Sequence, residues 1–76
     1  MTKTEFQNEI AIIIEGDLDS VAMDDQLGSL SGWDSLAIIG FIAMVDAKFG
    51  VALNISQLAE CKTVGDLAKL LGGKVD

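Results

Sequence analysis

The sequence contains no His, Arg, Pro or Tyr, and it has a single Cys among its 76 residues. Without His, neither a Ser–His nor a Cys–His nucleophile pair can form, and a structural zinc site lacks its usual ligands. One Cys excludes an internal disulfide and indicates a reducing compartment. The absence of Pro from a chain that is half apolar favours an all-helical protein. A chain of this length forms one domain, which we expect to span residues 1–76.

Positive charge is also scarce, with five Lys against twelve Asp and Glu and a net charge of −7. A nucleic-acid-binding protein needs a basic surface, and an anionic membrane would repel this chain. All of the net charge lies before Ser35, because residues 1–34 hold eight carboxylates and one Lys, whereas residues 35–76 hold four charges of each sign. We therefore expect no nucleic-acid partner, and any strong electrostatic partner should be basic.

Long apolar runs are missing as well. No run approaches the ~20 residues of a membrane span, so we expect no membrane insertion. The first residues, Met1 to Glu5, lack the charged and apolar regions of a signal peptide. These features together predict a cytoplasmic protein.

The beginning of the chain predicts a helix followed by a long loop. Thr2 and Glu5 have the spacing of a capping box, and the apolar residues that follow predict a helix over 3–15 that Gly16 ends. Residues 16–34 show no clean period, and a loop of this length in so small a domain is usually functional or disordered. Its scattered apolar residues indicate that it packs against the rest of the chain.

Capping residues also predict the later helices, which we expect over 35–49, 56–61 and 64–71. Their caps are Asp34 for the second helix, Asn54 or Ser56 for the short third helix, and Thr63 for the fourth. Gly50 ends the second helix, and Gly72 follows the fourth. The last three residues should fray.

The cysteine and the acidic residues of the chain give little support for catalysis or metal binding. Cys61 has no basic residue before it to lower its pKa, and a buried Cys at a helix end is the more frequent situation. An EF-hand loop beginning at Asp17 would need Gly at position 22 and Glu at position 28, where the chain has Ala22 and Gly28. We predict a protein that is not an enzyme and holds no metal.

The most specific feature is Leu30-Ser31-Gly32-Trp33-Asp34-Ser35-Leu36, which joins the long loop to an apolar helix. At this point the chain resembles the acyl and peptidyl carrier protein family, whose members carry Asp-Ser-Leu at the start of their second helix. Phe49-Gly50 and Thr63-Val64 match the family too, so the resemblance covers nearly the whole chain. It implies an all-α, acyl-carrier-like four-helix bundle with a short third helix and a long loop between the first two.

The resemblance also implies a role for Ser35. This residue would carry 4′-phosphopantetheine, delivered from coenzyme A by a phosphopantetheinyl transferase, with Asp34 and Leu36 as the flanking motif. The thiol of the arm would hold acyl or aminoacyl groups as thioesters between the enzymes that load them and the enzymes that take them. A helix N-terminus suits a phosphate, because its N–H groups lack partners and the helix dipole favours an anion. Trp33 is expected to anchor the loop on the bundle.

The predicted second helix departs from the family in its charge. Carriers of fatty acid synthesis typically have several carboxylates along this helix, whereas here Asp46 stands alone after Asp34 and Lys48 reverses the sign. A dedicated pathway therefore fits better than housekeeping fatty acid synthesis, with polyketide, modified lipid, surface polysaccharide and aminoacyl chemistry left open. The alternative from another class is a small non-enzymatic helical adaptor that binds a partner through the apolar face of this helix.

The helical period divides the second helix into two apolar faces. The face suited to the core holds Ile38, Phe41, Ile42, Val45 and Phe49, and the opposite face holds Leu36, Ile39, Gly40, Ala43 and Ala47. A bundle of this size cannot bury both, so we predict that the second face binds partner enzymes. A monomer is expected, with a dimer through this helix as the alternative. The bundle interior is a candidate site for an acyl chain, lined by Ile42, Val45, Leu58, Cys61 and Leu67.

Overall fold

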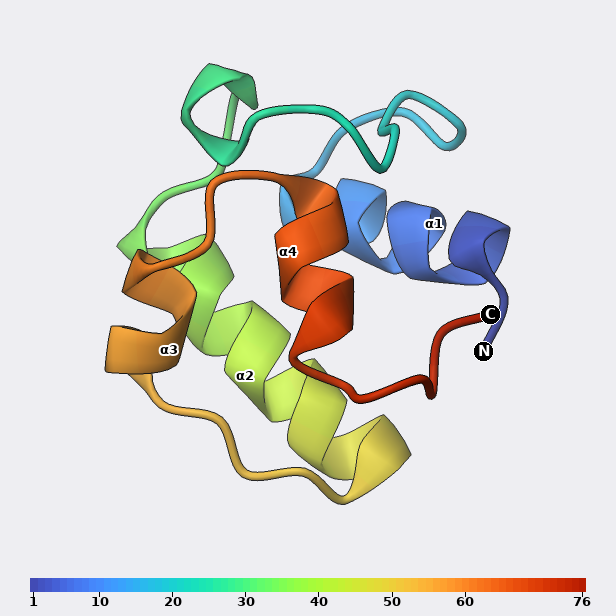
Figure 1. The fold of residues 1–76 in the computed structure, drawn as a ribbon. Helices are drawn as coiled ribbons and strands as arrows, with labels where there is room; N and C mark the ends of the chain where they lie inside the picture. The colour runs from blue at the N-terminus through green and yellow to red at the C-terminus, as the bar shows by residue number, and fades with distance from the viewer.

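Four α-helices and one 3-10 turn make up the computed structural model, which describes residues 1–76. The elements are α1 (Lys3–Ile13), η1 (Leu27–Ser29), α2 (Ser35–Phe49), α3 (Ile55–Ala59) and α4 (Val64–Lys69). In Figure 1, α1 and α3 lie on opposite sides of α4, and the long loop between α1 and α2 crosses the top of the view. The predicted all-α bundle is confirmed.

Each α-helix begins with a side-chain cap at the position that the sequence predicts. The Asn54 side chain accepts from the Gln57 N–H at 2.9 Å and thus starts α3, which settles the choice between Asn54 and Ser56. The other caps are Thr2 for α1, Asp34 for α2 and Thr63 for α4. Each such cap stabilises its helix by about 1 kcal/mol, which matters most for the two short helices.

The helix ends differ from the prediction more than the starts do. α1 stops at Ile13, and Glu15, not Gly16, takes the left-handed conformation with φ of 59°. The Gly16 N–H donates to the Ala11 carbonyl at 2.8 Å and the Glu15 N–H donates to the Ile12 carbonyl at 3.1 Å, which is a Schellman motif. The predicted end of this helix was therefore wrong. The helix ends at Ile13 and not at position 15, and Glu15 rather than Gly16 is the left-handed residue after it.

The other helix ends follow ordinary capping rules. α2 spans 35–49 as predicted, and Gly50 adopts the left-handed conformation after it. α3 covers 55–59 where we predicted 56–61. α4 ends at Lys69, two residues early, because its last turn tightens: the Leu71 N–H donates to the Ala68 carbonyl at 3.0 Å.

The core is entirely apolar and draws on all four α-helices. Phe41 of α2 is fully buried, and its ring meets that of Phe6 from α1 edge to face at 5.9 Å. Of the predicted core face of α2, Phe41 and Val45 are buried and the other three residues are half-buried. Ala37, which the pattern left out, is buried as well.

The loop between α1 and α2 packs against the bundle, as predicted. Its Val21 and Leu27 are buried, and the Gln7 side chain donates to the Val21 carbonyl at 2.6 Å. The loop also pairs with the start of α4, where the Leu27 N–H donates to the Lys62 carbonyl at 2.8 Å. Leu18 is the exception, since it remains largely exposed.

The last three residues do not hang free, contrary to the prediction that they fray. The Asp76 N–H donates to the Met1 carbonyl at 2.9 Å, and the Lys3 N–H donates to the Asp76 carbonyl at 3.1 Å. Figure 1 shows the two ends of the chain side by side. Backbone pairing between the two ends of a chain leaves no pattern of side chains in the sequence, so the sequence did not predict it.

Gly32 joins the loop to the end of α1 with no room for a side chain. Its φ is +91°, and a Cβ built there would lie 2.6 Å from the Ile14 carbonyl oxygen. Gly28, in the same loop, has nothing within 4 Å of the corresponding position and no positive φ. The path of the chain into Asp34 and Ser35 therefore depends on a glycine at 32.

Replacing Gly32 by Ala should destabilise the fold by about 1–3 kcal/mol, because the new Cβ meets backbone and the left-handed conformation is strained. Urea unfolding of Gly32→Ala against wild type measures the loss. The matched control is Gly28→Ala, which should leave stability unchanged or raise it by about 0.4–1 kcal/mol. Equal effects of the two substitutions would contradict the close approach at Gly32.

Two capping carboxylates give the fold a predictable dependence on pH. The backbone N–H groups of Lys62 and Thr63, at 3.0 and 3.2 Å, lower the pKa of Asp66, and the Thr2 N–H at 2.9 Å lowers the pKa of Glu5. A carboxyl group whose pKa is lower in the folded state than in the unfolded state stabilises the fold when it is ionised. This stabilisation is complete at any pH well above the unfolded-state pKa, which is about 4. That stabilisation is lost as the pH falls through the lower, folded value.

Asp66→Asn should therefore be less stable than wild type near neutral pH, and the difference should shrink as the pH falls below about 4, because both side chains are then uncharged. Melting temperatures recorded across this range test the expectation. Asp24→Asn is the control, since Asp24 is exposed and makes no hydrogen bond. A constant offset between wild type and Asp66→Asn at every pH would refute the role of the ionised carboxylate.

Candidate functional site

Ser35 is the first residue of α2, and its position is fixed by the cap before it. The Asp34 side chain accepts from the Ala37 N–H at 2.9 Å, and the Asp34 backbone is extended, so the chain turns abruptly into the helix. Ser35 is exposed. The N–H groups of the first turn have no carbonyl one turn earlier, and the dipole of this 15-residue helix favours an anion there. The first turn of a helix of this length therefore favours an anion such as a phosphate ester.

Trp33 ties this corner to the core, as the sequence predicts. Its ring meets the buried Phe41 ring at 6.0 Å with an interplanar angle of 70°. Trp33 itself is half-buried. Because Phe41 also meets Phe6 of α1, Trp33 packs against a residue that itself joins α2 to α1.

The apolar outer face of α2 is exposed next to Ser35. Leu36 and Ile39 have 75% and 57% of their surface exposed, and Ala43 and Ala47 are exposed too. Gly40 is half-buried, because it faces Ile13 of α1. The face named from the helical period therefore exists as a surface of the molecule, while its role as a docking face stays a prediction.

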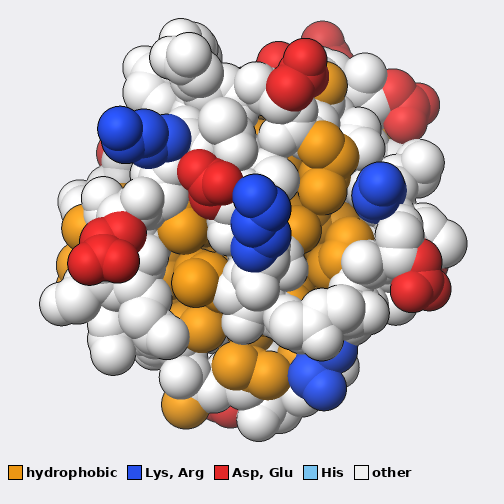
Figure 2. Space-filling view, viewed as in Figure 1, with side chains coloured by type: hydrophobic (Ala, Val, Ile, Leu, Met, Phe, Trp, Pro, Cys, Tyr) orange, Lys and Arg blue, Asp and Glu red, His pale blue; other side chains and the backbone are white.

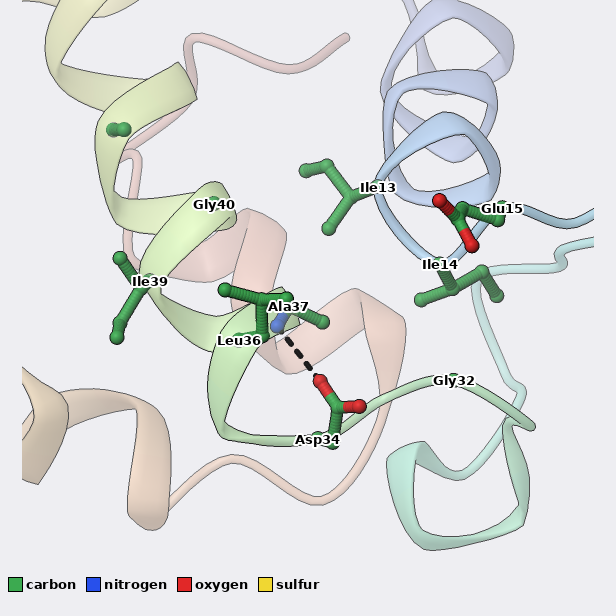
Figure 3. A pocket seen from close by; sticks show the side chains of 10 residues that line it. Ile13, Ile14, Glu15, Gly32, Asp34, Leu36, Ala37, Ile39 and Gly40 are labelled. Carbon is green, nitrogen blue, oxygen red and sulfur yellow. Dashed lines mark hydrogen bonds between the residues drawn. The ribbon is translucent and has the colours of Figure 1, made fainter.

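A groove of about 420 Å³ runs between the end of α1, the loop before α2 and the first turns of α2. Figure 3 shows Ile13, the last residue of α1, and Ile14 directly after it on one side, and Leu36 and Ile39 of α2 on the other, with Gly40 opposite Ile13. Ten residues line it: Ile13, Ile14, Glu15, Gly32, Asp34, Leu36, Ala37, Ile39, Gly40 and Ala43. Four of the five predicted docking residues belong to this groove. The contribution of α1 was missed, because pairing between distant helices leaves no local pattern.

The candidate acyl site in the bundle interior is not a cavity in this structure. Val45, Leu58 and Leu67 are buried in the core, Ile42 is half-buried, and none of them lines a pocket. Cys61 borders a shallow pocket beside Leu27 and Lys62, on the surface of the molecule. An acyl chain would have to repack the core to enter it, which a close-packed interior resists.

The surroundings of Cys61 disfavour the thiolate form of its side chain. Burial raises the pKa of its thiol, and the carboxylates of Asp66 and Glu60 raise it further. Its Sγ lies 3.5 Å from the Gln57 carbonyl oxygen, so the thiol serves as a hydrogen-bond donor at the end of α3. No group of three or more Cys, Asp or Glu side chains is placed to hold a metal ion, and no helix is long and apolar enough to span a bilayer.

Charge is distributed unevenly over the surface. In Figure 2, Lys and carboxylate side chains alternate over the face that α4 presents, with apolar patches between them, and carboxylates gather at the upper right, where Figure 1 shows the loop after α1. The one short ion pair between helices joins Lys48 of α2 to Glu9 of α1 at 2.9 Å. Lys48, half of whose side chain is exposed, thereby links α2 to α1.

Comparison with known proteins identifies the family of this chain. The family model described as "Phosphopantetheine attachment site" matches residues 6–71, a span that includes all of α2, α3 and α4 and most of α1. No curated protein and no solved structure matches the chain significantly. Because the family match covers most of the chain, this protein belongs to the phosphopantetheine-binding carrier family, whose members are non-catalytic and bear a covalent 4′-phosphopantetheine group.

Proposed function

We propose that Ser35 is the residue to which the phosphopantetheine is attached. The observation that carries this is the placement of its exposed hydroxyl at the head of α2, directly after the Asp34 cap. Of the other four serines, three lie in the loop and Ser56 lies in the first turn of the five-residue α3. None of them combines exposure with the start of a long helix, whose unpaired N–H groups hold a phosphate.

The cargo and the partners follow from the arm. Acyl or aminoacyl groups are carried as thioesters, and the partners are a phosphopantetheinyl transferase and the enzymes that load and remove the cargo. A dedicated pathway fits better than housekeeping fatty acid synthesis, because Asp46 is the only carboxylate within α2. The single free Cys supports the cytoplasm as the compartment.

Partner enzymes dock on the apolar outer face of α2 in this proposal. The face is Leu36, Ile39, Gly40, Ala43 and Ala47. Burying one large apolar side chain of this kind in a complex contributes about 1.5–3 kcal/mol, so Leu36 and Ile39 supply most of the contact energy. The small residues between them let a partner's backbone approach. The carboxylates before Ser35 steer a basic partner toward the attachment site and act mainly on the association rate.

Incubation with coenzyme A and a promiscuous phosphopantetheinyl transferase should add the mass of one phosphopantetheine to the wild type. Ser35→Ala should remove the modification and keep the melting transition, since the hydroxyl makes no contact in the core. Intact mass spectrometry with peptide mapping is the measurement, and Ser31→Ala, an exposed serine of the adjacent loop, is the control. Mass on another serine would overturn the assignment, and no added mass would favour the helical adaptor.

Ile39→Glu should weaken transfer of cargo to or from the cognate enzyme by about tenfold or more, because it places a charge in the apolar docking face. The matched control is Ile55→Glu on α3, where the residue is 61% exposed and outside the face. Transfer rates are measured with holo proteins, and thermal melts check that both variants fold. If both substitutions leave transfer unchanged, or if Ile55→Glu alone impairs it, the docking face lies elsewhere.

A further inference from the structure

We infer that a pocket between the start of α1, α4 and the last residues of the chain binds an acidic segment of a partner protein, one that presents Asp or Glu beside an apolar side chain. The pocket has a volume of about 350 Å³, and none of its lining residues belongs to α2 or α3. The inference goes beyond the proposed function, because it does not depend on what Ser35 carries.

The fold builds this pocket from segments that are far apart in the chain. Lys3 is the first residue of α1, and Met23 belongs to the loop between α1 and α2. Ala68 and Lys69 come from α4, and the backbone hydrogen bonds between the two ends of the chain place Val75 in the wall. In Figure 1 the two chain ends lie to the right of α4, whereas α2 begins to its left. The pocket therefore lies on a different side of the molecule from the start of α2.

The charged residues of the pocket are all cations. They are Lys3 and Lys69, on a chain with a net charge of −7, whereas the charged residues of the groove between α1 and α2 are Glu15 and Asp34. Lys3 makes no ion pair, and the Lys69 ammonium lies 4.0 Å from its partner Asp66. Exposed pairs of this kind contribute little, so both ammonium groups are available to a carboxylate from outside.

The rest of the lining selects a ligand with an apolar part beside its negative charge. Met23, Ala68 and Val75 are half-buried and offer apolar contact. The N–H groups of Gly73 and Val75 make no hydrogen bond within the chain, so backbone donors accompany the two lysines. Figure 2 shows apolar side chains with Lys on either side, to the right of α4 as Figure 1 places it. A carboxylate beside an apolar side chain matches both features.

The shape of the pocket favours a segment of a protein over a free ligand. A small-molecule site encloses most of its ligand, whereas every residue that lines this pocket is exposed or half-buried. Its occupant therefore needs further contacts around the pocket, which a protein surface supplies. An anionic membrane is the less suitable partner, because carboxylates lie among the lysines of this face and the chain as a whole is negative.

A partner at this pocket would leave the proposed docking face free. The pocket shares no residue with that face, which includes Leu36 and Ile39 of α2. The two surfaces also prefer opposite charges, since the carboxylates before Ser35 favour a basic partner and the lysine pocket favours an acidic one. An enzyme held at the pocket by one segment would meet the attachment site at a raised effective concentration.

The test titrates the isotope-labelled full chain, without any modification, with a capped hexapeptide in which Gly-Glu-Leu-Leu-Glu-Gly is the sequence. Saturable shifts are expected at the amides of Ala68, Gly73 and Val75, and the amides of Leu36 and Ile39 should stay unchanged. A peptide with Lys in place of Glu and a peptide with Ser in place of Leu should each fail to produce comparable shifts at the first three amides. Added salt should weaken the binding of the acidic peptide.

Substitution of the lysines measures their contribution. Lys3→Gln and Lys69→Gln should each raise the Kd of the acidic peptide by about two- to fivefold, because each removes one exposed charge from the pocket. The matched control is Lys62→Gln, which removes the same charge from an exposed Lys outside the pocket and should leave the Kd unchanged. Thermal melts check that the three variants fold.

The inference is overturned if shifts centre on α2, if no saturable shift occurs at millimolar peptide, or if Lys62→Gln weakens binding as much as Lys69→Gln does. Octanoate that gives the same shifts at the same affinity would assign the pocket to a small amphiphile instead. Binding to vesicles of anionic lipid that Lys69→Gln abolishes would assign it to a membrane. Either result would also overturn the inference of a protein partner.

Discussion

The packing of Phe41 is the interaction on which the rest of this structure depends. Its ring is fully buried and meets Phe6 of α1 on one side and Trp33 of the loop on the other, both edge to face. Two aromatic pairs of this kind are each worth about 0.5–1.5 kcal/mol beyond the burial of their area. Through them, α2 is fixed against α1 and the loop is fixed against α2. Ser35 therefore stands at a corner whose geometry the core determines.

This packing also explains why α2 has a bare apolar side. A bundle this small has one core, and the ring of Phe41 directs one face of α2 into it. The opposite face, with Leu36 and Ile39, has no element of the chain left to cover it. An exposed apolar surface beside the proposed attachment site lowers the solubility of the protein, and this cost is offset if partners bind the surface. The net charge of −7 disfavours association of such a chain with its own copies.

Local signals in the sequence predicted the helix starts well, because a cap is a contact between residues three positions apart. Thr2, Asp34 and Thr63 are caps in the structure because their side chains reach the N–H groups of the next turn. The exposure of Leu36 and Ile39 was predictable for a similar reason, since it follows from the helical period alone.

Contacts between distant segments were not predictable in this way. The backbone pairing of Asp76 with Met1 and the pairing of Leu27 with Lys62 join residues far apart in the chain, and neither leaves a pattern of side chains. The left-handed Glu15 was missed because the neighbouring Gly16 was the more obvious candidate.

The groove between α1 and α2 was not predictable either, because it depends on contacts between distant segments of the chain. The Schellman motif ends α1 at the point where Ile14 meets Gly32, and the close approach of their backbones leaves Ile13 and Ile14 facing the first turns of α2. Small residues at 37, 40 and 43 of α2 cannot fill the space between the two helices. A longer side chain at position 43, where α2 is exposed, would fill part of it. The groove beside Ser35 thus has three causes. The helix α1 ends at Ile13, Gly32 allows the close approach of the Ile14 carbonyl, and the residues of α2 at 37, 40 and 43 are small.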